Sequence, residues 1–154
     1  MKVMVVDDER IKRISLGDAI AAHGHDVAVF ETAAKGLEAL ARKPFDVVIT
    51  DLKMPEMDGI SFLKRIKQIS SSTYVILMTA YGTVDLAVEA MRQGAYDFIM
   101  KPFSNEEMLV RLNRIEEQFN LVTENIALKR EIQRRHPGKL IGKSAGMLRL
   151  YETI

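Results

Sequence analysis

Two kinds of hydrophobic pattern alternate along the first two thirds of the chain. Short apolar runs rich in β-branched residues predict strands at 2–6, 25–30, 45–50, 73–79 and 96–100. Between them, apolar positions recur every three or four residues and predict helices over 11–23, 33–42, 60–69 and 84–91. Strands that alternate with helices are typical of an α/β protein whose parallel sheet is covered on both faces. We therefore predict a doubly wound sheet with the strand order 2-1-3-4-5.

The pattern after Ser104 differs, because no Gly or Pro occurs before Pro137, and it predicts one helix of roughly 30 residues. Ser104 and Glu107 have the spacing of a capping box at its start. Apolar residues then follow the alternating three- and four-residue spacing of a coiled coil, and the predicted dimer seam consists of Leu112, Ile115, Phe119, Val122 and Ile126. The alternative is a single amphipathic helix that packs on its own domain.

The residues after the long helix help to predict the domain organisation of the chain. Pro137 and Gly138 end the long helix, and the residues that follow are too few to bury a core of their own. Gly-Lys-Ser at 142–144 is not read as a phosphate-binding loop, because Pro137 stands where that motif needs a glycine. We predict an α/β domain at 1–118, a helical coiled-coil linker at 119–136 and the start of a further, truncated domain at 137–154.

The composition narrows the class of partners. With 22 basic and 21 acidic residues, the net charge of +1 gives the whole chain no reason to bind nucleic acid or an anionic membrane. The chain has no cysteine, so disulfides and thiolate metal ligands are excluded. No apolar window approaches the roughly 18 residues of a membrane-spanning helix. We expect a cytoplasmic protein with no membrane partner.

Acidic residues stand at the ends of two predicted strands. Asp7 and Asp8 follow the first strand and Asp51 follows the third, and these two strands are neighbours in the predicted order. Three carboxylates in one crevice repel one another unless a cation is bound, and hard oxygen ligands suit Mg²⁺. We predict a Mg²⁺ site here, which Mn²⁺ could also occupy.

The ends of the fourth and fifth strands add a hydroxyl, Thr79, and a flexible cation, Lys101. With Asp51 as a nucleophile, these groups are what phosphoryl transfer to a carboxylate requires. Each residue alone has a plainer interpretation, as a helix cap, a strand residue or a solvated charge. Two other functions stay open: an aspartyl phosphatase, which would need an acid where Lys53 stands, and a dimerisation module with an inactive crevice.

Four motifs resemble those of response-regulator receiver domains. They are Val-Asp-Asp-Glu at 6–9, Thr-Asp-Leu-Lys-Met-Pro at 50–55 with Asp-Gly at 58–59, Met-Thr-Ala-Tyr-Gly at 78–82 and Lys-Pro-Phe at 101–103. The resemblance spans residues 1 to about 118 and implies the CheY-like, flavodoxin-like fold. It implies that Asp51 is the phosphoacceptor for a sensor histidine kinase.

The same resemblance implies a role for other residues of the crevice. Mg²⁺ would be held by Asp7, Asp8, Asp51 and the Lys53 carbonyl. Thr79 and Lys101 would bind the phosphoryl group, Phe98 would change rotamer with Thr79, and the Lys101–Pro102 peptide bond would be cis. Tyr81 and Lys53 flank the inferred phosphoryl site, and we expect them to shield it from water.

Residues 83–98 resemble the NtrC branch of this family, which activates sigma-54-dependent transcription, and Leu-Ile-Gly-Lys-Ser at 140–144 is similar to the start of that branch's AAA+ domain. The resemblance implies a homodimer. It implies ATP, DNA and sigma-54 RNA polymerase as partners of the full-length parent only, and for this fragment no enzyme activity beyond assisting its own phosphoryl transfer. Glu56 stands where many relatives carry glycine, which leaves the local backbone in question.

Overall fold

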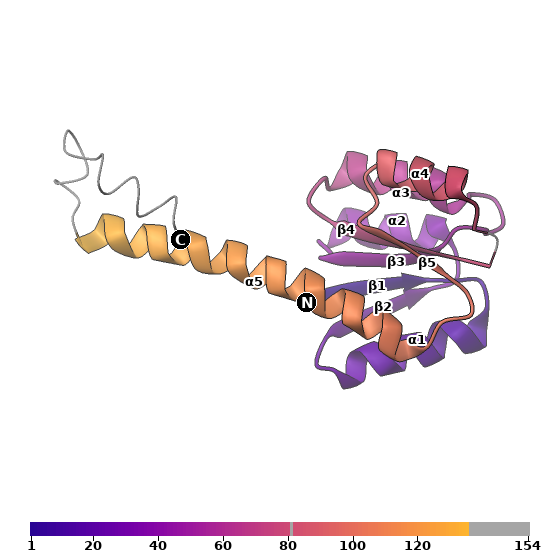
Figure 1. Ribbon diagram of the computed structural model, residues 1–154, viewed down its shortest axis with the longest axis horizontal. Coiled ribbons are helices and arrows are strands. Elements are labelled where there is room, and N and C mark those ends of the chain that lie inside the picture. Colours follow the sequence, from indigo (N-terminus) through magenta and orange to yellow (C-terminus); the bar gives the residue numbers. More distant parts are fainter. Residues whose placement is uncertain (81, 136–154) are drawn as a thin grey trace. The chain divides into compact units, whose positions relative to one another are not determined.

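The fold is one parallel five-stranded sheet with helices on both faces (Figure 1). The computed structural model describes the backbone of residues 1–80 and 82–135, and the side chains of 1–80 and 82–121. The strands, in the order β2-β1-β3-β4-β5, are β1 Lys2–Val6, β2 Asp26–Phe30, β3 Val47–Asp51, β4 Tyr74–Thr79 and β5 Asp97–Met100. The helices are α1 Arg10–Ala22, α2 Ala33–Arg42, α3 Gly59–Ile69, α4 Val84–Arg92 and α5 Asn105–Arg135. The predicted fold class and strand order are confirmed.

Helix α1 lies on one face of the sheet, and α2, α3 and α4 lie on the other (Figure 1). The central strand β3 is buried at all five positions, and β1 and β4 are buried at all but their first residue. Strands covered on both faces need apolar side chains at successive positions, which explains their continuous apolar runs. The fully buried residues of α3, Phe62, Leu63 and Ile66, pack with Val48 and Leu77 in the main core cluster.

Side-chain caps begin most of the helices. Thr32, Asp58 and Thr83 each accept a hydrogen bond from the backbone N–H three residues on, at the starts of α2, α3 and α4. Ser104 Oγ accepts from the Glu107 N–H at 3.2 Å, as the predicted capping box requires of its first member. Such bonds satisfy N–H groups that the first turn of a helix leaves unpaired. They fix where each loop at the carboxyl edge of the sheet ends.

The loop from β3 to α3 is drawn tightly against the end of the sheet. The Leu52 N–H donates to Met78 O and the Gly59 N–H donates to Leu52 O, both at 2.7 Å. A Cβ on Gly59 would lie 2.7 Å from the backbone oxygen of Asp51, so only glycine fits there. Glu56 has a φ of +70°, in the left-handed region that favours glycine, so the local backbone here is one that glycine would adopt with less strain.

Helix α5 contains 31 residues, which agrees with the predicted length, and the chain divides into two compact units, Met1–Leu109 and Val110–Ile154. The domain limits at 118 and 136 stay predictions, and residues 136–154 lie outside the described part. Leu112 and Ile115 are 0% exposed in the single chain, whereas Phe119 is 40% exposed.

The predicted dimer seam of Leu112, Ile115, Phe119, Val122 and Ile126 stays a prediction. Leu112 and Ile115, at its start, fall within the predicted 1–118 domain. The side chains of Val122 and Ile126 lie outside the described residues, so the coiled coil itself stays a prediction.

Candidate functional site

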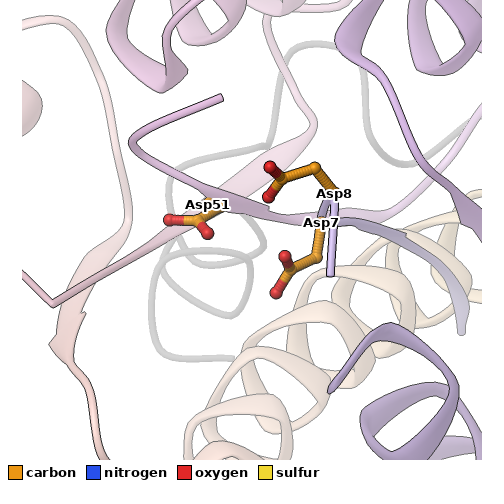
Figure 2. A group of neighbouring side chains, drawn as sticks. All are labelled: Asp7, Asp8 and Asp51. Carbon is orange, nitrogen blue, oxygen red and sulfur yellow. The ribbon is translucent and has the colours of Figure 1, made fainter. Parts of the chain in front are cut away.

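Three carboxylates meet at the carboxyl edge of the sheet. Asp51 is the last residue of β3, and Asp7 and Asp8 directly follow β1, which pairs with β3 so that Val6 lies opposite Thr50. One oxygen from each of the three side chains lies within 4.8 Å of the other two. Figure 2 shows the side chains of Asp7, Asp8 and Asp51 close to one another at this edge. Asp7 and Asp51 are buried, and Asp8 is exposed. The strand order brings together the three acids that the sequence placed at these strand ends.

Lys101 reaches two of these carboxylates from the end of β5. Its Nζ lies 2.9 Å from Asp51 Oδ2 and 3.4 Å from Asp7 Oδ2, with the lysine side chain only 10% exposed. Burial alone would lower the pKa of Lys101, but the hydrogen bond to Asp51 and the charges of both carboxylates outweigh it and raise the pKa. The ammonium is therefore fully charged at neutral pH. The peptide bond to Pro102 is cis, as predicted.

Asp7 is the most deeply buried of the three acids, at 2% exposure. Burial raises the pKa of Asp7, and the Asp51 charge adds to the rise, although the Glu9 N–H and the Lys101 ammonium partly offset it. The Lys101 ammonium pairs with Asp7 and Asp51, and the three carboxylates lie close together. Like charges at this separation repel one another, and a bound cation would relieve that repulsion.

The crevice opens into a hollow of about 460 Å³ beside Asp8, Asp51 and Lys101. Lys53, Pro55 and Ala80 line the same hollow. The Lys53 N–H donates to Asp51 Oδ1 at 3.4 Å, a long hydrogen bond, while the ligand role of its carbonyl stays a prediction. A space of this size accepts a small phosphorylated group beside the acids.

Strand register places the two predicted switch residues on the same face of the sheet. Leu77 lies opposite Phe98 and Thr79 lies opposite Met100, and alternate residues of a strand share a face. Thr79 is therefore a diagonal neighbour of Phe98. Thr79 is 1% exposed and lines a second hollow of about 270 Å³, and Phe98 packs, partly buried, against the main core cluster. Tyr81 lies outside the described residues.

Arg13 is a residue of this region that the sequence analysis did not single out. Its Nη1 donates to the backbone oxygen of Asp7 at 2.8 Å. A side chain that binds a backbone carbonyl leaves no composition signal. Its position one turn into the helix that follows the two acids is the only sequence hint.

Residues 3–113 match the family model described as "Response regulator receiver domain", so this chain belongs to the response-regulator receiver family. That assignment agrees with the strand order and with the group of acids at the sheet edge. The prediction made from the four motifs is confirmed. Among the described residues, no helix combines the length and the apolar character needed to cross a membrane.

The relatives are transcriptional regulators of the predicted branch. The chain is 38% identical over 155 residues to the C4-dicarboxylate transport transcriptional regulatory protein DctD of Pseudomonas aeruginosa, across 99% of this chain and 34% of DctD. It is 45% identical over 112 residues to the DNA-binding transcriptional regulator NtrC of Escherichia coli, across 73% of this chain and 24% of NtrC. The chain thus spans about a third of the length of DctD and about a quarter of the length of NtrC.

A solved structure with the same fold is titled the solution structure of the beryllofluoride-activated NtrC4 receiver domain dimer. It superposes with a TM-score of 0.73 and 35% identity, over 77% of this chain and 98% of that one.

Proposed function

We propose that this chain is a phosphorylation-controlled signal receiver of a two-component system, in which Asp51 accepts a phosphoryl group from the phosphohistidine of a sensor histidine kinase. One observation carries the proposal. Asp51 stands at the edge of an open hollow with the Lys101 ammonium 2.9 Å away and two further carboxylates close by. This combination supplies a nucleophile, a positive charge and room for the donor in one place.

The residues of the crevice fit a hard divalent cation. The donors are carboxylate oxygens, and their mutual distances of at most 4.8 Å come near the roughly 3 to 4 Å between ligands of one Mg²⁺ ion. Asp8 is exposed and makes no hydrogen bond through its carboxylate within the described residues. We propose that Asp7, Asp8, Asp51 and the Lys53 carbonyl hold Mg²⁺, or Mn²⁺ in its place. The bound ion would neutralise negative charge on the phosphoryl oxygens.

The protein's own part in the transfer is alignment and charge neutralisation. An Asp51 oxygen forms a bond to phosphorus in line with the bond to the departing imidazole nitrogen, which keeps the electron pair of the broken bond. Asp51 is used as the carboxylate, so no general base is needed. The Lys101 ammonium already contacts Asp51 Oδ2 and is placed to bind the charge brought by the phosphoryl group.

We propose that the phosphoryl group then draws in the Thr79 hydroxyl and that Phe98 follows into the space released. The shared sheet face of the two side chains and the hollow beside Thr79 support this coupling. The movement would alter the surface of α4 and β5, where Val84, Val88, Met91 and Met100 are exposed. An exposed apolar strip of this kind is suited to a homodimer.

The output is proposed to pass through the 119–136 linker into a domain that begins at 137–154. In the full-length parent, that domain would use ATP, with DNA and sigma-54 RNA polymerase as further partners. These activities are proposed for the parent and not for this fragment, whose own chemistry is limited to its phosphorylation.

The proposal is tested by incubating the protein with Mg²⁺ and acetyl phosphate and measuring its intact mass by mass spectrometry. We expect the mass gain of one phosphoryl group per chain, which disappears after acid treatment because acyl phosphates are labile, and no gain when EDTA replaces Mg²⁺. Continuous release of phosphate without an adduct would support an aspartyl phosphatase instead. Absence of both products would support an inactive crevice.

Phosphorylation is expected to strengthen self-association, because the exposed strip on α4 and β5 changes shape. With beryllofluoride and Mg²⁺ as the phosphoryl mimic, sedimentation velocity over a concentration series should show the dimer dissociation constant fall by about tenfold or more. Val88→Glu should abolish this response, because it places a charge in the strip.

Ile69→Glu is the matched control, since Ile69 on α3 is 49% exposed, as is Val88, but lies outside the strip. It should respond like the wild type. A dissociation constant that beryllofluoride leaves unchanged in the wild type would contradict the coupling of site and surface.

A further inference from the structure

Every polar group of Asp7 has a partner. Its N–H donates to the backbone oxygen of Phe30 at 3.2 Å, and its own backbone oxygen accepts from Arg13 Nη1 at 2.8 Å. Its carboxylate accepts from the Glu9 N–H at 2.9 Å through Oδ1 and from Lys101 at 3.4 Å through Oδ2. Asp7 is therefore held on all sides before any cation arrives.

Asp8 is different. It is exposed, and its carboxylate makes no hydrogen bond within residues 1–80 and 82–121. Within the described residues, the direction in which the Asp8 side chain leaves the main chain is therefore set by the backbone. The Asp7 carbonyl and the Asp8 N–H belong to one planar peptide unit, so the orientation of that carbonyl sets where the Asp8 Cα and side chain begin.

Arg13 holds this peptide unit from a rigid base. The Arg13 N–H donates to Glu9 O at 3.0 Å, which places its backbone in the first hydrogen-bonded turn of α1. From there the guanidinium reaches back to the Asp7 carbonyl. The pKa of Glu31, which follows β2, is lowered mainly by its hydrogen bond to Lys35 and slightly by the Arg13 charge.

We propose that Arg13 is a positioning residue for the cation site, which orients Asp7 and Asp8 by holding the peptide bond between them. This inference rests on the proposed divalent-cation site. Residues that hydrogen-bond to a metal ligand without touching the metal commonly change metal affinity by about 10- to 100-fold when they are removed. Arg13 is such a residue here, but it binds the backbone carbonyl of Asp7 and not the carboxylate.

A plain electrostatic role for Arg13 predicts the opposite sign. Removing a positive charge near an acidic crevice should tighten the binding of a cation, because one source of repulsion is lost. Removing a positioning contact should weaken it. The sign of the change in affinity therefore separates the two roles.

The experiment measures the affinity of the whole chain for Mn²⁺ alone, by water-proton relaxation, in wild type, Arg13→Ala, Arg13→Lys and Arg10→Ala. Arg10 is the control, because it is an exposed arginine of the same helix with no hydrogen bond or ion pair found within the described residues. We expect Arg13→Ala to weaken binding about tenfold, Arg13→Lys to weaken it less, and Arg10→Ala to leave it unchanged or slightly tighter. Arg13→Ala that binds Mn²⁺ as tightly as Arg10→Ala overturns the inference.

A second measurement does not need the cation. Hydrogen exchange of the Glu9 amide, which donates to Asp7 Oδ1, should be faster in metal-free Arg13→Ala than in Arg10→Ala, while amides of β3 and β4 keep their protection and report an intact fold. Unchanged exchange at Glu9 would also count against the inference. Failure of the wild type to bind Mn²⁺ would instead refute the proposed cation site itself.

Discussion

Asp51→Asn is expected to abolish phosphorylation by acetyl phosphate. The amide keeps the size of the side chain, so the hydrogen bond from the Lys53 N–H can remain, but it removes the anionic oxygen that attacks phosphorus. Among the three clustered acids, Asp51 alone ends a fully buried strand and contacts Lys101 at 2.9 Å. Intact-mass measurement after incubation with Mg²⁺ should show no adduct.

Asp18→Asn is the matched control, since it makes the same chemical change at an exposed position of α1. It should take up one phosphoryl group at the wild-type rate. An adduct of wild-type extent on Asp51→Asn would show that another residue is the acceptor. Mass mapping of peptides would then identify that residue, with Asp8 the first to be examined because it lies in the same cluster and is exposed.

Asp7→Asn is expected to have opposite effects on stability and on cation binding. Without a cation, Asp7 is a nearly buried carboxylate beside two others, and its raised pKa reflects the free-energy cost of its charge there. Removing the charge should stabilise the cation-free protein by on the order of 1 kcal/mol, which raises Tm by a few degrees. The neutral amide keeps an oxygen able to accept the Glu9 N–H.

The same substitution should remove the stabilisation that Mg²⁺ gives. A ligand at ten times its dissociation constant stabilises the folded state by about 1.4 kcal/mol, and loss of one carboxylate ligand should nearly eliminate this gain. Thermal unfolding of wild type and Asp7→Asn, each with EDTA and with Mg²⁺, tests both effects. A lower Tm for Asp7→Asn in EDTA, or an equal rise with Mg²⁺ in both proteins, would contradict this account.

Much of the fold was predictable because its signals are local. The apolar runs at 47–50 and 74–79 and the glycines that end α1 and α4 are readable from neighbouring residues, and the strands were placed to within two residues at each end. The sequence predicts that the third strand ends at residue 50, just before Asp51. In the structure β3 is one residue longer, so that Asp51 is part of the strand and pairs with Met78.

The long helix shows where local signals stop. Leu112 and Ile115 have the spacing of a coiled-coil seam, and their side chains are 0% exposed, whereas Phe119 is 40% exposed. Helical spacing shows that one face is apolar, but it does not show whether that face packs on its own chain or on another.

The sequence by itself determined the alternating elements and the residue types at the four strand ends, because propensity and periodicity act between neighbours in the chain. The sequence also predicted that the ends of the first and third strands are neighbours, and only the tertiary structure decided the contacts between the side chains at these ends. Strand pairing joins residues far apart in sequence, and it brings Lys101 within 2.9 Å of Asp51 and places Phe98 diagonal to Thr79. The tertiary structure also shows the hydrogen bond from Arg13 to the Asp7 carbonyl, which depends on how α1 packs beside the end of β1. A hydrogen bond of that kind depends on distance in space, which no pattern of apolar and polar residues records.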